Sequence, residues 1–252
     1  VGDINSDGYQ DLILIGCTNV DVTTCSGYSS KVYVNNGSGL KEDAEWGKNL
    51  TGMNSGSIAL GDINNDGHLD LVAAGCTSGG SLIDPCNSGN EISKIYISNG
   101  SSFIDSDVWK GSIANVARGS VALGDINNDG KIDLILTGAA HSSIISKVYT
   151  NNGNGFSESQ SFESGLTGTF KGQAVLADLN KDGKLDLIIS GSTAYGGGNQ
   201  FTEVYINNGT HFLANSTWSS NIMALTESSI TVGDFDNNGN IDLAIMGVGD
   251  YL

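Results

Sequence analysis

Basic residues are scarce in this sequence. Lys and Arg together number 11, against 28 Asp and Glu, and the formal net charge is -17. Binding to nucleic acid or to an anionic membrane surface requires clustered Lys and Arg, so we exclude both as direct partners. Long apolar runs are also missing, and none reaches the roughly 18 residues of a membrane-spanning segment. The hydrophobic fraction of 38% is nevertheless sufficient for a folded core.

The residue types that usually carry catalysis are few and scattered. Of the three histidines, His68 lies in an acidic segment, whereas His141 and His211 lie in unrelated loop positions. The sequence has no Gly-x-Ser-x-Gly nucleophile motif, no phosphate-binding loop and no zinc signature. We therefore expect a protein that is not an enzyme.

Acidic residues are concentrated in five segments with the consensus Asp-x-Asn-x-Asp-Gly-x-x-Asp. We call them the acidic loops: residues 3–11, 62–70, 125–133, 178–186 and 234–242. Each contains three acids, so 15 of the 28 lie in them and the other 13 nearly balance the 11 bases. The loops start 53 to 63 residues apart, which indicates a repeat architecture. We interpret residues 1–252 as one domain with repeats that begin near Val1, Ser57, Ser120, Gln173 and Ser229.

One repeat reads as four strands. In the second repeat, residues 57–61 and 69–75 are short apolar segments on either side of the acidic loop, which is typical of two strands joined by a tight turn. Residues 94–100 alternate in character and end in Asn-Gly, a strong turn signal. Phe103 and then Trp109 indicate a fourth strand. Four strands per repeat without helical periodicity predict an all-β fold of propeller blades.

The acidic loops and their flanks resemble the FG-GAP family of calcium-binding β-propeller repeats, also described as integrin α-type or VCBS-like. The residues that carry the resemblance are 60–71 (LGDINNDGHLDL) and 123–134 (LGDINNDGKIDL), and the pattern extends over the whole chain. The resemblance implies a β-propeller of four-stranded blades. We count four blades' worth of strands plus a partial blade, and expect the chain to be part of a larger propeller of about seven blades.

Each acidic loop offers the oxygen ligands that calcium prefers. Counting from its first Asp, positions 1, 3, 5 and 9 supply side-chain oxygens and position 7 a backbone carbonyl. A glycine follows position 5, where we expect a sharp turn with positive φ. The expected ligands of up to five structural Ca²⁺ ions are Asp3, Asn5, Asp7, Tyr9 and Asp11; Asp62, Asn64, Asp66, His68 and Asp70; Asp125, Asn127, Asp129, Lys131 and Asp133; Asp178, Asn180, Asp182, Lys184 and Asp186; and Asp234, Asp236, Asn238, Asn240 and Asp242.

Two other structures could in principle use an acidic pattern of this kind. An EF-hand requires Glu at position 12 and flanking helices, whereas position 12 here is apolar in all five repeats. A metal-free hairpin of Asx-turns is the other alternative. It leaves three carboxylates within nine residues without a neutralising cation, and calcium therefore explains the pattern better. Magnesium fits less well, because it keeps its water ligands.

Large side chains recur at three positions of the repeat. We expect them to fill the space between neighbouring blades, and a ring of exposed sugar-stacking platforms is the alternative. The three sets are Tyr33, Tyr96, Tyr149 and Tyr205; Leu40, Phe103, Phe156 and Phe212; and Trp46, Trp109, Phe162 and Trp218.

The four cysteines occur in two similar loops. Their positions predict the bridges Cys17–Cys25 and Cys76–Cys86, with four free buried thiols as the alternative. Candidate glycosylation sites with the pattern Asn-x-Ser/Thr are Asn36, Asn49, Asn99, Asn208 and Asn215. Together with calcium loops, these features favour an extracellular or cell-surface glycoprotein.

We expect the protein to act as an adhesion, surface or structural assembly module. It would associate with proteins, or with itself, through the variable loops that follow the second strand of each repeat, or through blade edges. A lectin-like propeller that binds carbohydrate is one alternative, and a polysaccharide-active enzyme on a propeller scaffold is another. Fold alone does not choose between them.

Overall fold

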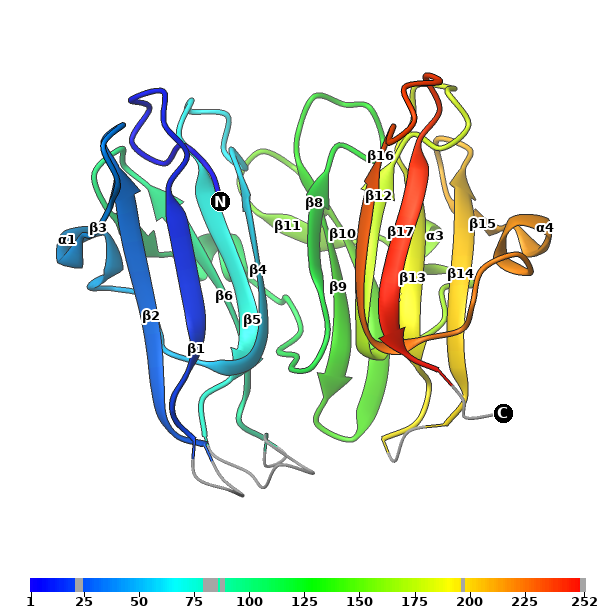
Figure 1. Cartoon of the computed structure of the whole chain (residues 1–252), viewed down its shortest axis with the longest axis horizontal. Coiled ribbons are helices and arrows are strands. Elements are labelled where there is room, and N and C mark those ends of the chain that lie inside the picture. The colour runs from blue at the N-terminus through cyan, green and yellow to red at the C-terminus, as the bar shows by residue number, and fades with distance from the viewer. Residues whose placement is uncertain (21–24, 79–85, 87–88, 196–197, 250–252) are drawn as a thin grey trace.

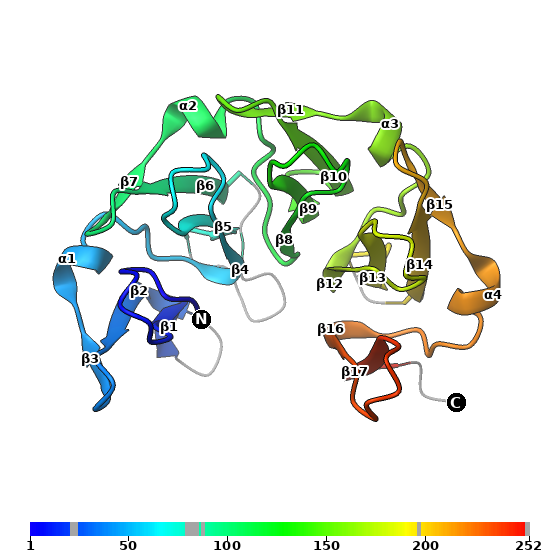
Figure 2. The same cartoon turned by 90° about the horizontal axis from the view of Figure 1, so that it is seen from above.

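The protein is all-β, with strands arranged in five antiparallel sheets. The computed structural model describes residues 1–252 except 21–24, 79–85, 87–88, 196–197 and 250–252. The sheets stand side by side in an open arc, with the first and last sheets at its two ends (Figure 2). The acidic loops lie at one end of the sheets, and the turn at residues 141–142, which follows the second strand of the third repeat, lies at the other (Figure 1).

Three sheets have four strands each, in the order of the chain from the inside of the arc to its rim. These are β4 (Asn54–Gly61), β5 (Asp70–Cys76), β6 (Glu91–Ser98) and β7 (Phe103–Asp105); β8 (Val121–Gly124), β9 (Asp133–Ala140), β10 (Ser143–Asn151) and β11 (Phe156–Glu158); and β12 (Phe170–Ala177), β13 (Asp186–Ser192), β14 (Gln200–Asn207) and β15 (Phe212–Ala214). The four-stranded repeat predicted from the sequence is confirmed.

The sheets at the two ends of the arc have fewer strands. The first contains β1 (Leu12–Val20), β2 (Cys25–Asn35) and β3 (Leu40–Glu42), and the last contains β16 (Thr226–Gly233) and β17 (Asp242–Val248). Gly2 forms an isolated bridge with Asp11 beside β1. The sheets are consistent with propeller blades, and they form an arc rather than a closed ring.

A short helix follows the outer strand of four repeats, a feature that sequence periodicity did not reveal. The helices are α1 (Ala44–Gly47), α2 (Asp107–Lys110), α3 (Gln160–Glu163) and α4 (Ser216–Ser219). A polar side chain caps three of them; in α2, for example, Ser106 Oγ accepts a hydrogen bond from the Trp109 backbone N–H. Each is a single turn, too short for a 3.6-residue pattern to emerge. Trp109 therefore lies on a helix and not on the fourth strand.

The repeated aromatic side chains join neighbouring sheets. Trp46 of α1 packs edge to face against Phe103 of the next sheet, with ring centroids 5.0 Å apart. Trp109 and Phe156 (5.8 Å), and Phe162 and Phe212 (5.4 Å), repeat this contact. Such pairs add about 0.5–1.5 kcal/mol beyond the burial of their apolar area. The prediction that these residues fill the space between sheets is confirmed for these three pairs, whereas Leu40 in the first sheet and Trp218 of α4 are 53% and 38% exposed.

The tyrosines of the third strands are buried as well. Tyr96, Tyr149 and Tyr205 are each 1% exposed. Their hydroxyls accept hydrogen bonds from the backbone N–H groups of the connection that leaves the preceding sheet, at Thr51, Ala114 and Thr167. The tyrosines therefore fasten each connection to the following sheet.

Of the two predicted disulfides, Cys76–Cys86 is present. Cys17 is also disulfide-bonded, but the side chain of its expected partner, Cys25, lies outside the described residues. Among the described residues, no helix is long and apolar enough to cross a membrane.

Close backbone contact between the first and second strands depends on glycine. A Cβ atom on Gly172 would lie 1.7 Å from the Ser190 carbonyl oxygen, and one on Gly119 would lie 1.8 Å from that of Thr137. Neither carbonyl can move away without breaking the strand pairing around it. By contrast, a Cβ atom on Gly16 of β1 meets nothing within 4 Å.

We predict that Gly172→Ala lowers the free energy of unfolding by about 2–3 kcal/mol, because the methyl group forces the two strands apart. Gly16→Ala is the matched control and should change it by less than about 0.5 kcal/mol. Urea unfolding followed by circular dichroism measures both variants. Equal urea midpoints for Gly172→Ala and Gly16→Ala would contradict the close contact between Gly172 and the Ser190 carbonyl.

Candidate metal sites in the acidic loops

The backbone of each acidic loop takes the same compact turn. Position 4 has a left-handed conformation in all five loops, and so does the glycine at position 6. In the first loop these residues are Ser6 (φ 60°) and Gly8 (φ 92°). The positive φ expected at the glycine is confirmed, whereas the left-handed residue at position 4 was not foreseen. This turn directs several backbone N–H groups towards the carboxylates.

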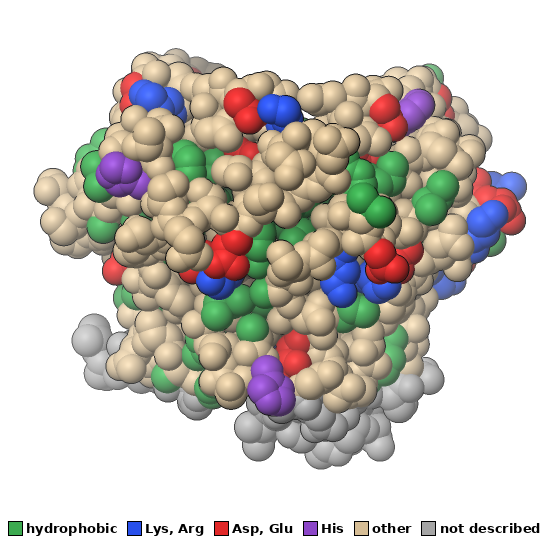
Figure 3. All heavy atoms as spheres, turned by 180° about the vertical axis from the view of Figure 1, so that it is seen from behind, with side chains coloured by type: hydrophobic (Ala, Val, Ile, Leu, Met, Phe, Trp, Pro, Cys, Tyr) green, Lys and Arg blue, Asp and Glu red, His purple; other side chains and the backbone are tan. Residues whose placement is uncertain are grey.

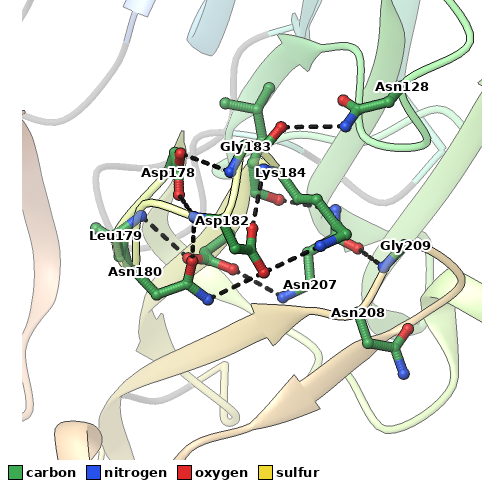
Figure 4. A network of polar contacts seen from close by, with 12 residues as sticks. Asn128, Asp178, Leu179, Asn180, Asp182, Gly183, Lys184, Asn207, Asn208 and Gly209 are labelled. Carbon is green, nitrogen blue, oxygen red and sulfur yellow. Dashed lines mark hydrogen bonds and ion pairs between the residues drawn. The ribbon is translucent and has the colours of Figure 1, made fainter.

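The carboxylates hold the turn by accepting those N–H groups. In the fourth loop, Asp178 Oδ1 accepts from the Asp182 N–H at 3.1 Å and its Oδ2 accepts from Gly183 at 2.9 Å (Figure 4). Asn180 Oδ1 also accepts from the Asp182 N–H, at 2.9 Å, and Asp182 Oδ1 accepts from Lys184, at 2.9 Å. The same bonds recur in the other loops, so positions 1, 3 and 5 face the interior of one turn.

The acid at position 9 joins the loop to the third strand. Asp186 Oδ2 accepts from the Leu179 N–H at 3.0 Å, and its Oδ1 accepts from the Asn207 N–H of β14 at 2.8 Å. Asp70, Asp133 and Asp186 are 0% exposed, and Asp11 is 1% exposed. Both oxygens of each buried carboxylate are therefore used by backbone donors from two segments that are distant in the sequence.

Burial raises the pKa of these carboxyls. The pKa of Asp70 rises to about 6, because removal from water outweighs the backbone N–H groups of Ser98 and Ile63 that favour the anion. Burial likewise raises the pKa of Asp133 to about 6 and that of Asp186 above its usual value. Neighbouring acids of the same loop add to the effect. A cation close to these groups would offset that cost.

Neighbouring acidic loops are also bonded to one another. Asn128 of the third loop donates from Nδ2 to the Gly183 carbonyl of the fourth at 3.0 Å (Figure 4). Asn207 Nδ2 donates to the Ile126 carbonyl of the preceding repeat at 2.7 Å and to Leu185 of its own at 3.0 Å. Asn65 and Asn151 make the corresponding contacts one repeat earlier. The second, third and fourth loops are thus bonded into one layer.

The donor set of each loop fits a hard cation. It consists of carboxylate, amide and carbonyl oxygens at the spacing that calcium uses. Among the described residues, the fifth loop brings carboxylate oxygens of Asp234, Asp236 and Asp242 within 4.8 Å of one another. In the other four loops position 3 is Asn, so an amide oxygen replaces the carboxylate that Asp236 supplies in the fifth loop. The residues that would hold an ion are therefore positions 1, 3, 5 and 9 and the carbonyl of position 7.

Two loops carry a cation of their own. Lys131 Nζ lies 3.0 Å from Asp129 Oδ2, and Lys184 Nζ lies 3.1 Å from Asp182 Oδ2. The hydrogen bond from the Lys184 ammonium lowers the pKa of Asp182. Position 7 is Tyr9, His68 or Asn240 in the remaining loops, which lack this internal ammonium group.

The candidate glycosylation sites occupy two kinds of position. Asn36, Asn99 and Asn208 are exposed at the turn between the third and fourth strands, and their Oδ1 atoms bond to the following backbone. The other two have structural bonds. Asn49 Nδ2 donates to the Phe103 carbonyl at 2.8 Å, and Asn215 caps α4. A glycan on Asn49 would displace that hydrogen bond.

Comparisons with known proteins agree with this geometry. A family model described as "FG-GAP-like repeat" matches residues 3–73 and 125–189, more than half of the chain. The chain therefore belongs to the FG-GAP-like repeat family, as its sequence predicted. The sequence matches no curated protein.

A solved structure of similar fold is a lectin from Agrocybe aegerita, described as specifically recognising non-reducing terminal N-acetylglucosamine. The two proteins share 18% sequence identity and superpose with a TM-score of 0.53 over 94% of this chain. The chain spans 61% of the lectin's length. At this identity the likeness shows the fold alone.

Positions 5 and 9 of a loop should respond differently to mutation. We predict that Asp133→Asn destabilises the protein by about 2–3 kcal/mol even in a chelator, because an amide N–H₂ then faces a buried backbone donor. Asp129→Asn, on the exposed side of the same loop, should have little effect in chelator. Both should reduce the stabilisation gained on adding calcium. Urea unfolding with and without calcium measures these effects, and equal losses for the two variants in chelator would contradict the role of Asp133.

Proposed function

We propose that the chain is a calcium-stabilised β-propeller module that works by binding and not by catalysis. The observation that carries the proposal is the set of acidic loops, whose carboxylates hold their own turns in all five repeats and of which the second, third and fourth are bonded to each other. A bound Ca²⁺ would neutralise the carboxylates of each loop. The chain's own contribution is to orient their oxygens through backbone N–H groups before any ion arrives.

Binding in this proposal involves the end of the sheets remote from the acidic loops. The connections from β1 to β2, β5 to β6, β9 to β10 and β13 to β14 differ in length from repeat to repeat, whereas the strands and acidic loops are nearly constant. Variable loops on a rigid scaffold are where recognition usually resides. The Cys76–Cys86 bridge favours an oxidising, extracellular setting. Proteins or further copies of the module are the partners we propose.

Closure into a ring of about seven blades is part of the same proposal. It is supported by the outer face of the last sheet, where Met246 is 69% and Val248 is 44% exposed. The equivalent strand β13 is buried along its whole length. A further sheet on β17 would cover this apolar surface.

Basic surface suited to nucleic acid is not seen on the outer face of the arc. Lysines there lie next to acids in separate small groups and not in one patch (Figure 3). Examples are Lys147 with Glu158 and Glu163, at 2.9 and 2.7 Å. This pattern supports protein or carbohydrate as the partner.

Calcium dependence is the first test of the proposal. Removing calcium with EGTA should lower the melting temperature by about 10 °C or more, because several sites that bind only the folded state add their stabilisation. Adding calcium should restore it, whereas sodium at equal ionic strength should not. Asp66→Ala should reduce this shift in melting temperature by about the contribution of one calcium site. Scanning calorimetry measures the shift, and identical curves with and without calcium would refute a structural metal.

Carbohydrate binding is the second candidate, and a pocket at the outer edge of the fourth repeat favours it. The pocket lies between β14 and α4 and has a volume of about 420 Å³; its walls include Gln200, Phe201, Glu203, Ser216 and Ile222. Hydroxyl, amide and carboxylate groups beside an apolar wall suit a sugar. The fold shared with the Agrocybe aegerita lectin is compatible with this candidate.

This pocket departs from the pattern of the other repeats. Where the other three repeats have Lys31, Lys94 and Lys147 paired with an acid of the fourth strand, this one has Glu203, and Ala214 replaces the acid. We predict that N-acetylglucosamine binds here and that Glu203→Lys weakens binding at least about tenfold. Lys94→Glu, at the same position of another repeat, is the control. Calorimetric titration measures both, and equal affinities would eliminate this pocket.

A further inference from the structure

The outer edge of the fourth repeat differs in charge from that of the other three. In each of the first three repeats, a lysine of the third strand pairs with an acid of the fourth strand. The pairs are Lys31 with Glu42 (2.7 Å), Lys94 with Asp105, and Lys147 with Glu158 (2.9 Å). The fourth repeat has Glu203 in place of the lysine and Ala214 in place of the acid. It therefore keeps a negative charge at this position and lacks the ammonium group.

This exchange lies in the wall of the pocket between β14 and α4, which has a counterpart in the first repeat. The counterpart lies between β2, β3 and α1, has a volume of about 230 Å³, and includes Lys31 and Glu42 in its wall. The pocket between β14 and α4 uses the same positions of the repeat and has a volume of about 420 Å³. Ala214 leaves space that an acidic side chain fills elsewhere. The counterpart is open although a complete four-stranded sheet follows it, so the position does not depend on an incomplete neighbour.

The wall of the pocket between β14 and α4 is fixed by hydrogen bonds. Figure 2 shows α4 at the rim of the arc, from where the chain returns to β16 at the inside. Thr202 Oγ1 of β14 donates to the Met223 carbonyl of this connection at 2.9 Å. Phe201 and Leu225 form an isolated β-bridge beside it. The connection is thus held against β14, and the pocket is formed before a ligand arrives.

Several polar groups of this wall can act towards a ligand only as hydrogen-bond acceptors. The hydroxyl protons of Thr202, Ser219 and Ser220 are donated to backbone carbonyls, so these oxygens have only lone pairs left. Gln200 Oε1 is buried and receives no hydrogen bond within the described part of the chain. A ligand that satisfies these groups must therefore carry hydrogen-bond donors.

Glu203 is held in a way that leaves one carboxylate oxygen for a ligand. Its Oε2 atom accepts hydrogen bonds from Thr167 Oγ1 at 2.6 Å and from the Tyr205 hydroxyl. Its Oε1 atom accepts none from the residues that the structure describes. Both partners are neutral, and no Lys or Arg is among the described residues that line the pocket. The negative charge is therefore available to a cation.

We propose that the pocket between β14 and α4 binds an amino sugar through its primary ammonium group. The inference rests on the carbohydrate-binding function proposed for the same pocket, and it specifies the charge of the sugar. The ammonium group takes the space beside Ala214 and donates to Glu203, and it replaces the lysine of the other repeats. Ring hydroxyls donate to the wall, and Phe201 contacts the apolar side of the ring. An N-acetyl group carries no charge and forms the weaker complex.

The test compares sugars that share one ring and differ in charge. Glucosamine, N-acetylglucosamine and glucose are titrated by calorimetry into the full chain at constant calcium, at a pH where the amine is protonated. Glucosamine should bind at least about tenfold more tightly than either neutral sugar, because only it forms a charge-assisted hydrogen bond with Glu203. This advantage should shrink as salt rises. Nα-acetyl-lysine carries the ammonium group without the ring and should bind at least about tenfold more weakly than glucosamine.

Two variants separate charge from shape. Glu203→Gln keeps the size of the side chain and removes its charge, so the advantage of glucosamine should disappear while the affinity for N-acetylglucosamine stays within about twofold. Ala214→Lys places an ammonium group of the chain itself beside Glu203 and should exclude glucosamine. Lys31→Gln, at the equivalent position of the first repeat, is the matched control and should change none of the affinities. Melting curves show which variants are folded, and either variant of the fourth repeat suffices.

The outcomes distinguish this inference from the carbohydrate-binding function on which it rests. If N-acetylglucosamine binds as tightly as glucosamine, the inference is overturned and the carbohydrate candidate is kept. If none of the three sugars binds, both are overturned. Binding of Nα-acetyl-lysine as tight as that of glucosamine would assign the pocket to a lysine of a partner protein and overturn the amino sugar. An unchanged preference for glucosamine in both Glu203→Gln and Ala214→Lys would also overturn it.

Discussion

A buried carboxylate with two backbone partners organises each complete repeat. Asp70, Asp133 and Asp186 accept one N–H from the start of their own acidic loop and one from the end of the third strand. These bonds fix how far the loop extends and where the third strand stops. Charge-assisted bonds of this kind are worth about 1.5–3 kcal/mol each, and the raised pKa shows what burial costs in return. The proposed cation site would therefore form around a group whose position is already set.

The two ends of the sheets differ in which residue types have a left-handed backbone. At the acidic end, positive φ values fall largely on Asn and Gly, which tolerate them, and the loops repeat almost without change. At the other end, strained positions carry Ser, Arg, Lys and Glu, and the connections vary. Uniform residues at one end serve the scaffold. Differing residues at the other end, held on the same backbone, are what a binding surface requires.

Much of this structure could be predicted from the sequence. Five acidic loops in register between apolar segments were enough to predict the four-stranded repeat, its family and the packing of the aromatic side chains, because each follows from local patterns repeated several times. Position 9 was predicted to be a metal ligand, but its hydrogen bond to the third strand was not predicted. That bond joins Asp186 to Asn207 across 21 residues, and no local pattern encodes the pairing. The same holds for Asn207, which had been assigned no role.

The one-turn helices and the pocket in the middle of the arc were not predicted, for different reasons. A helix of four residues has no period to detect, although capping by Ser106 or Asn215 is a signal that could have been used. The pocket in the middle of the arc is assembled from single residues of four repeats, and these differ between them: Ser55, Arg118, Lys171 and Glu227. Aligning the repeats would have shown a residue of changing identity directly before a glycine in three repeats and before Ser228 in the fourth. Its left-handed backbone and its position at the centre emerge only in three dimensions.

The edge-to-face contacts between aromatic rings have a consequence for how such a chain grows. Each pair takes one ring from a short helix and the other from the outer strand of the next sheet, as Trp46 and Phe103 do. The repeated unit is therefore the contact between two sheets as much as it is one sheet. A sheet on its own supplies one ring to each of two such contacts and completes neither. Trp218, which is followed by a sheet without an outer strand, is 38% exposed, while Trp46 is 5% exposed. Duplication of a whole repeat inserts one complete junction, so the number of repeats can change during evolution without redesign of any interface.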